Sequence, residues 1–434
     1  MPRFTSVQNL HRNLSQTSER RRLKLSMDDA SRTTEMGPSM TGQAVAEKGG
    51  AGGLIATLAA LFITGFGSFL NLYVTQPLLP EFRHIFHASE ILVSLSVSAP
   101  VFAVALTAPL VGLLSDGVGR KRVIIASMLG LALPTALAAT AANLGQLIVW
   151  RFLTGLFMPG VTAVAVAYVG EESPAESAGL TMGTYVTGMA IGGFAGRFLA
   201  GLFATWWGWR VAFLCLGVIT VAAALTTWWL LPRSTKFVRQ SNVAAALRSM
   251  RAHLRNPQLL ATYAVGFSLL FCLVATFTYV NFYLADKPFF LGPAALASIF
   301  AVYLIGAVIT PVTGHIMDRV GHRKMLMGAI AVSGTGLLLT LIHSMPFIIV
   351  GLALMAGGVF TSQSAALSHL GRATNEARSS ASGLYVSLYY LGGFVGSVLP
   401  GFLWSWAGWP GCVVIVLCIQ GLTILIAGKL WHDV

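Results

Sequence analysis

A repeat of about 200 residues constrains the fold of this chain more than any other feature. Residues 192–209 return as residues 392–409, and 9 of the 18 aligned positions are identical. A second pattern, Gly-x3-Asp-x2-Gly followed by basic residues, begins at Gly112 and returns at Gly314, 202 residues later. Two separate matches at nearly the same spacing indicate a duplicated unit of about 200 residues. We therefore expect two similar halves.

The composition indicates that both halves lie in lipid. Hydrophobic residues make up 55% of the chain and charged residues only 10%. A soluble domain carries about 25% charged residues, so this chain cannot present an ordinary aqueous surface. The apolar runs are continuous and lack the alternation of a membrane β-strand, which favours helices that cross the bilayer.

Twelve such helices fit the chain, because each needs about 20 apolar residues. The predicted spans are 54–79, 91–115, 123–142, 146–169, 177–204, 211–231, 259–285, 293–316, 325–343, 347–369, 380–404 and 409–428. Both copies of the Gly-x3-Asp motif carry basic residues and should face the same side, so an even number of spans separates them. The expected fold is an all-α membrane protein with twelve transmembrane helices in two parallel six-helix repeats.

The domain boundaries follow from the polar segments. Residues 1–53 are polar and basic, and we expect a disordered cytoplasmic tail with no cleavable signal peptide. Residues 54–232 form the first six-helix half, and residues 259–434 form the second. Between them, residues 233–258 are the longest internal polar stretch, which we interpret as a cytoplasmic central loop.

The net charge of +13 reflects membrane topology rather than nucleic-acid binding. On the predicted spans, 23 of the 28 Lys and Arg residues fall on one side of the membrane. Only Arg83, Arg210 and Lys287 fall on the other side, and Arg151 and Arg197 lie inside spans. Positive residues concentrate on the cytoplasmic side, so we expect a multi-pass protein with both termini in the cytoplasm. The lipid bilayer is its expected partner, and nucleic acid is not.

The loop that begins at Gly112 reads G-L-L-S-D-G-V-G-R-K-R and resembles motif A of the major facilitator superfamily, G-x-L-x-D-x-x-G-R-K. Arg151 with Gly155 and Gly160 resembles the motif B of that family. The stretch Y-V-T-Q-P-L-L-P from Tyr73 resembles a bacterial inner-membrane branch, the YnfM-like branch, which is grouped with drug and arabinose efflux proteins. The resemblance implies a transporter of the cell inner membrane.

One departure from the drug antiporters of this family concerns their motif C. That motif contains a Gly-Pro pair, whereas Gly192-Gly193 stands in its place here. No proline occurs between Pro174 and Pro232. The departure weakens the transfer of drug:proton antiport to this chain.

The resemblance also implies a gate on the cytoplasmic side. Asp116 would pair with basic residues and with a helix terminus of the other half, and Gly119 would permit the tight turn. The alternative is a loop that only sets topology. The residues assigned to this gating motif are Gly112, Asp116, Gly119, Arg120, Lys121, Asp318 and Arg319.

Charged residues inside the predicted spans are few. None of the 15 acidic residues lies near the middle of a span, so proton coupling cannot be inferred from an intramembrane carboxylate. If coupling exists, Asp116 at the membrane edge is the best carboxylate candidate. Arg151 and Arg197 lie at similar depth, roughly 9–12 Å from the outer face. Asn71 or Gln76 could supply carbonyl acceptors for these arginines.

Two interpretations of the arginines stay open. They are either substrate or coupling residues, or structural residues that tie helices together through backbone carbonyls. The second half contains uncharged polar side chains that suit a pocket in the middle of the membrane, although each of them alone is more often a packing residue. These groups are Tyr279, Asn281, Tyr303, Gln363, Tyr385, Tyr389 and Tyr390.

Transport is the function that these features favour. We expect a monomeric secondary transporter that moves a small organic molecule by alternating access, in the direction of export, with protons as a candidate coupling ion. An importer of a small organic anion is the alternative, and a non-transporting receptor is the alternative from another class. The four cysteines show no metal-ligand spacing and no Walker A pattern occurs. We therefore expect no metal, no cofactor, no catalytic residues and no enzyme activity.

Overall fold

The computed structural model describes residues 40–174, 176–234, 248, 251–306, 309, 316–317, 319–374 and 378–431. The side chains of residues 40–52, 110–118 and 378–379 are not among those described. The chain divides into a unit Met1–Ile55 and a unit Ala56–Val434. The features below lie in the second unit, except for the helical residues before Ala56.

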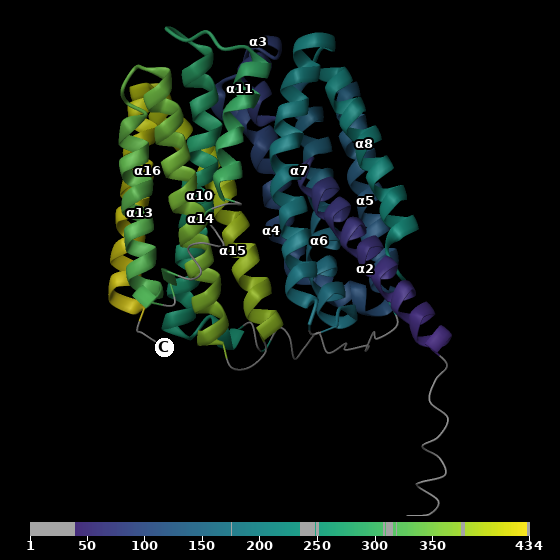
Figure 1. The fold of residues 1–434 in the computed structure, drawn as a ribbon. Coiled ribbons are helices and arrows are strands. Elements are labelled where there is room, and N and C mark those ends of the chain that lie inside the picture. Colours follow the sequence, from purple (N-terminus) through teal and green to yellow (C-terminus); the bar gives the residue numbers. More distant parts are fainter. Residues whose placement is uncertain are drawn as a thin grey trace, which may run out of the picture. The chain divides into compact units, whose positions relative to one another are not determined.

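Helices account for the whole architecture of the described residues, which contain no strand. The first repeat contains α2 (Met40–Phe69), η1 (Gln76–Leu78), α3 (Leu79–Ile85), α4 (Glu90–Val118), α5 (Arg120–Leu137), η2 (Ala138–Thr140), α6 (Leu144–Glu172), α7 (Ala178–Trp207) and α8 (Trp209–Leu230). The second repeat contains α10 (Pro257–Ala285), α11 (Pro293–Ile299), η3 (Phe300–Tyr303), α13 (His322–Leu339), α14 (Met345–Ala373), α15 (Arg378–Val398) and α16 (Pro400–Leu430). Figure 1 shows them coloured along the chain.

Capping residues begin several of the long helices where the apolar runs start. Asn143 caps α6, because its side-chain oxygen accepts a hydrogen bond from the backbone N–H of Gln146 at 2.8 Å. The side chain of Asn256 caps α10 in the same way. Such caps satisfy N–H groups that have no partner within the helix. Asn143 and Asn256 therefore mark where α6 and α10 begin.

Length and composition mark these helices as membrane spans. Within the described residues, eight helices are long and apolar enough to cross a bilayer, and Gly53–Phe69 and Pro293–Gly306 are shorter apolar helices. Two further helices, α13 and α15, overlap the predicted spans 325–343 and 380–404. Each predicted span thus contains helix within its described residues, and the twelve-helix prediction is confirmed.

Two of the boundaries that differ from the predictions lie in the first repeat. The prediction of a tail without regular structure up to residue 53 is wrong for its last part, since α2 already begins at Met40. Several residues between Gln43 and Lys48 are good helix formers, which explains the extension. The span predicted to run to residue 79 is broken after Phe69, where turns precede η1. Pro77 and Pro80 lie in the first turns of η1 and α3, where the missing N–H of proline leaves no helical hydrogen bond unmade.

The repeat is visible in the backbone as two pairs of matching turns. Gly119 and Gly321 have φ of 97° and 86°, and each immediately precedes the next helix. Gly208 and Gly408 form the second pair, with φ of 84° and 60°. Only glycine adopts this region without strain. The same positions in both halves thus require glycine, which explains why these residues recur in the sequence.

Helices from the two repeats meet along α7 and α4. α7 packs against α11, and α4 packs against α15. Gly201 of α7 approaches the backbone of Pro293, and Gly401 near the start of α16 approaches Ile91 of α4. The absence of side chains at these glycines lets the helices of opposite repeats come close. The interface between repeats is where the candidate site lies.

Candidate functional site

Arg197 is a buried arginine at the contact between the two repeats. It lies on α7, is 3% exposed, and its guanidinium carbon lies 4.7 Å from the ring centroid of Tyr73 and 4.9 Å from those of Phe300 and Tyr303. Cations bind the faces of aromatic rings through the negative potential of the π system. Tyr73 comes from the first repeat, whereas Phe300 and Tyr303 come from η3 of the second. Arg197 thus contacts both repeats.

Gln76 extends this contact into a chain of hydrogen bonds between the repeats. The Nε of Arg197 donates to the side-chain carbonyl of Gln76 at 2.7 Å, and the side-chain amide of Gln76 donates to the hydroxyl of Thr278 on α10 at 3.3 Å. All three side chains are buried. The carbonyl acceptor that the sequence suggested for an intramembrane arginine is therefore present at Gln76.

The guanidinium of Arg197 keeps unused hydrogen-bonding capacity. Its Nη1 donates to the carbonyl of Gly193 at 2.5 Å, one turn earlier on α7. Its Nη2 has no hydrogen-bond partner among the described residues, and no carboxylate of that part of the chain pairs with Arg197. A buried cation without a counter-ion is unfavourable in a membrane. A ligand with an acceptor group would improve its environment.

Arg151 is enclosed by backbone carbonyls. Its Nη2 donates to the carbonyl of Leu72 at 2.6 Å, and its Nε donates to the carbonyl of Ser96 at 3.3 Å. These bonds tie α6 to α4 and to the turn after α2. Arg151 is 0% exposed, and its Nη1 is buried without a partner. The contacts match the structural interpretation, because a ligand has no access to this guanidinium.

Three other residues considered from the sequence form hydrogen bonds within their own helix or to a neighbouring one. The amide of Asn71 donates to the hydroxyl of Thr220 on α8 at 2.9 Å, and the amide of Asn281 donates to a carbonyl one turn earlier on its own helix, at 2.6 Å. The hydroxyl of Tyr279 donates to the carbonyl of Ser397 at 3.0 Å, between α10 and α15. The structure does not bring these three side chains into contact with Arg197.

Aromatic side chains of the second repeat form a group that continues from Arg197. Tyr303 stacks edge to face on Phe277 with centroids 4.5 Å apart. On α15, Tyr389 lies against Tyr385 at 6.0 Å, and the hydroxyl of Tyr385 donates to the side-chain carbonyl of Gln363 on α14 at 3.0 Å. Gln363 and Tyr389 are thus joined through Tyr385, in the same repeat as Phe300 and Tyr303.

The predicted cytoplasmic end contains an ion pair next to motif A. Arg120, at the start of α5, donates from Nε and Nη2 to the carboxylate of Glu171 near the end of α6, at 3.0 and 2.6 Å. Arg120 is 6% exposed. Lys121, the next residue of the motif, is half-buried. Glu171 was missed as a site residue, because 51 residues separate it from Arg120.

The second copy of the motif has a histidine where the first copy has Arg120. His322, the counterpart of Arg120, shares a hydrogen bond of 2.8 Å with the hydroxyl of Ser368 on α14. Arg319 is exposed. Asp318 lies outside the described residues, and Gly112 and Asp116 lie in the last turns of α4, where side chains are not described. The predicted pairing of Asp116 stays a prediction.

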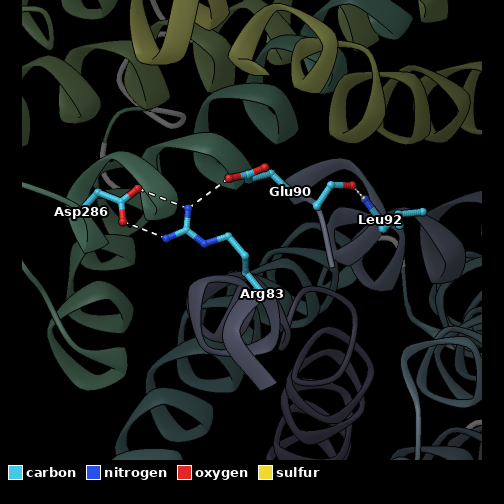
Figure 2. Close-up of polar contacts among 5 residues, drawn as sticks. Arg83, Glu90, Leu92 and Asp286 are labelled. Carbon is cyan, nitrogen blue, oxygen red and sulfur yellow. Dashed lines mark hydrogen bonds and ion pairs between the residues drawn. The ribbon is translucent and has the colours of Figure 1, made fainter. Parts of the chain in front are cut away.

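The opposite end contains an ion-pair network that the sequence did not predict. Arg83, in the last turn of α3, donates to both carboxylate oxygens of Asp286 at 2.8 and 3.2 Å and to Glu90 at 3.0 Å (Figure 2). Arg83 and Glu90 belong to the first repeat, whereas Asp286 follows α10 of the second. The pair between Arg83 and Asp286 therefore fastens the repeats together at the predicted outer end.

The fold consists of two parallel helical repeats with a buried site between them and ion pairs at both ends. This arrangement is that of a membrane transporter. The family model described as Major Facilitator Superfamily matches residues 61–306 and 289–433. The chain belongs to this superfamily, and it is a transporter that spans the membrane several times.

Named relatives and solved structures agree with this assignment. The chain is 33% identical to the uncharacterized MFS-type transporter YybF of Bacillus subtilis, over 86% of this chain and 93% of the relative. It is 31% identical to the inner membrane transport protein YnfM of Escherichia coli, over 86% and 89%. The solved structure of a point mutant of the nucleoside transporter NupG aligns with a TM-score of 0.72 at 14% identity, covering 86% of this chain and 98% of NupG. A bacterial homolog of the human lysosomal transporter Spinster, inward-facing and unoccupied, aligns with a TM-score of 0.68 at 17% identity, covering 87% and 98%.

Proposed function

We propose that this chain is a secondary transporter that moves a small organic molecule across a bacterial inner membrane by alternating access. The observation that carries this proposal is the Arg197 site. A guanidinium that is buried between the repeats, held by Gln76 and covered by three rings, keeps one nitrogen without a protein partner among the described residues. A binding site whose walls come from both repeats changes its access when the repeats rock against each other.

The charges around the site favour a cargo with an acidic group. Neither Arg151 nor Arg197 has a carboxylate partner within the part of the chain described. A cationic cargo would meet the like charge of Arg197, whereas a carboxylate or phosphate could bond to its Nη2. The rings of Tyr73, Phe300 and Tyr303 would contact its apolar part.

We propose export as the direction, with both termini in the cytoplasm and protons as the coupling ion. The resemblance of the motifs to a branch grouped with efflux proteins supports export. The ion pair between Arg83 and Asp286 fits a state that receives cargo from the cytoplasm, since it joins the repeats at the outer end. Import of an organic anion is the second candidate, because the same arginine charges would serve either direction.

A ligand screen on purified protein tests the proposal. The melting temperature is measured with matched sets of anionic, neutral and cationic compounds, for the wild type, Arg197→Lys and the control Arg210→Lys. Arg210 is exposed near the start of α8 and donates to a backbone carbonyl. We expect anions to stabilise the wild type and the control, with Arg197→Lys losing most of this effect because lysine lacks the planar fork.

Transport of each stabilising compound is then measured in proteoliposomes by exchange between labelled and unlabelled compound. Exchange of an anion that requires Arg197 supports the proposal. Stabilisation by cations alone contradicts the proposed cargo class. Binding without exchange or net flux in either direction favours a receptor over a transporter.

A further inference from the structure

A crevice at the predicted outer end lies where the two repeats meet. It has a volume of about 430 Å³. Pro77, Glu81 and His84 line it from η1 and α3, Thr205 lines it from α7, and Pro293 and Leu296 line it from α11 of the second repeat. Its walls therefore separate whenever the repeats move apart at this end.

Glu81 is the carboxylate of this crevice. Its Oε2 atom is buried and has no hydrogen-bond partner among the described residues. Proline, alanine and leucine side chains dominate the surroundings, and this burial raises the pKa of the Glu81 carboxyl group. Glu81 lies on α3, beyond the predicted end of the first span at residue 79. It is thus accessible from the outer medium once the crevice opens.

No titratable side chain of the described residues forms a hydrogen bond with the buried Oε2 of Glu81. His84 lines the crevice on the same helix. Arg83 donates hydrogen bonds to Glu90 on α4 and to Asp286, which follows α10, so its guanidinium is paired with those two carboxylates. Lys287 is exposed after α10. The lining residues from α7 and α11 are Ala204, Thr205, Pro293 and Leu296, which do not titrate.

We propose that Glu81 is the proton-binding site that couples the pH of the outer medium to closure of the outer end. This inference rests on the proposed alternating-access function. The ligand is a proton, because one carboxylate in an apolar crevice offers too few oxygen atoms for a metal cation.

The direction of the coupling follows from burial. The closed crevice favours the neutral carboxyl group, and an open crevice filled with water favours the carboxylate. Proton binding therefore stabilises the closed state. That stabilisation is complete at low pH and is lost as the pH rises through the raised pKa of Glu81. A proton from outside would thus promote return to the inward-facing state.

Glu81 is also connected to the Arg197 site through the chain. η1 and α3 are consecutive, and Gln76 at the start of η1 bonds to both Arg197 and Thr278. A displacement of α3 on opening therefore moves the residue that holds Arg197. Proton release at Glu81 and cargo release at Arg197 are in this way parts of one movement.

Labelling of a cysteine in the crevice tests the inference without any cargo. Ala204→Cys is placed on the α7 wall of a chain whose four native cysteines are replaced by alanine, and its labelling by a charged maleimide is measured against outer pH in proteoliposomes. We expect faster labelling as the outer pH rises. Glu81→Gln should label slowly at every pH, because glutamine resembles the protonated form. Glu81→Asp and the control His84→Gln should keep the pH dependence.

The outcomes separate this inference from the proposed function. If the labelling rate of Glu81→Gln keeps the pH dependence of the wild type, the inference is overturned. It is also overturned if the labelling rate follows the sodium concentration at constant pH. If only His84→Gln loses the pH dependence of labelling, the proton binds to the histidine, and the inference about Glu81 is overturned. Absence of transport in the wild type, with labelling as expected, contradicts the proposed function but leaves the pH-dependent opening intact. Thermal melting of each variant verifies that it folds.

Discussion

Removing the ion pair between Arg83 and Asp286 should open the predicted outer end. The pair is bidentate, with N–O distances of 2.8 and 3.2 Å, and Arg83 is 18% exposed while Asp286 is 48% exposed. Exposed ion pairs contribute about 0.2–1 kcal/mol, and bidentate geometry places this pair near the upper value. A loss of about 1 kcal/mol changes an equilibrium about fivefold.

The pair between Arg83 and Glu90 should not influence this equilibrium. Both residues belong to the first repeat and move together, so their contact is the same in either state. We therefore expect Asp286→Asn to shift the population of the outward-open state about fivefold. Glu90→Gln serves as the matched control and should leave that population near the wild-type value.

Distances between spin labels measure the two populations. Labels on the exposed residues Ile85 and Ala295 report the separation of the repeats at this end. A double-mutant cycle with Arg83→Gln and Asp286→Asn should give a coupling energy of about 1 kcal/mol that shrinks in high salt. Equal distance distributions in the wild type and Asp286→Asn, or an equal shift in Glu90→Gln, would refute the reasoning.

Three further predictions concern packing, the gate and topology. Gly196→Ala should lower the melting temperature, because the added Cβ would collide with the carbonyl of Leu70. The control Gly193→Ala should fold normally, since the nearest atom to a Cβ there lies at 3.6 Å. Equal melting temperatures of the two variants would contradict this packing. Asp116→Asn should greatly reduce flux while the protein still folds. Asp318→Asn should reduce flux less, because the second motif copy lacks the Arg-Lys order. Wild-type flux in both variants would mean that the loop only sets topology. Tags placed after residue 50, within residues 240–250 and after Val434 should report the cytoplasm, and a tag near Pro288 should report the outer side. A central loop found on the outer side would contradict the predicted topology.

The sequence was sufficient to predict the helices and the repeat. In lipid, an apolar run of about 20 residues has to satisfy its backbone as a helix, so length and composition are enough. The repeated glycines likewise indicated matching turns, which Gly119 and Gly321 form. The contact between Gln76 and Arg197 could be anticipated, because an arginine inside the membrane needs a polar partner and Gln76 was expected at a similar depth.

The sequence could not predict which face of each helix points to the site. Most helices are apolar on every side, so hydrophobic periodicity does not distinguish the inner face from the lipid face. Asn71 and Tyr279 were therefore included as site candidates, although they bond to Thr220 and to a backbone carbonyl near α15. The partnership of Arg83 with Asp286 depends on how helix ends align across the repeats, 203 residues apart.

The most direct test of the central claim combines flux and melting temperature for Arg197 variants. Substitution by alanine leaves the buried carbonyl of Gln76 without its donor, at a cost of about 1–3 kcal/mol if the role is purely structural. Lysine keeps the charge but loses the bidentate fork. We predict that Arg197→Lys retains part of the anion flux and that Arg197→Ala abolishes it, with flux falling far more than stability. A parallel fall of flux and melting temperature in both variants would contradict an anion site at Arg197.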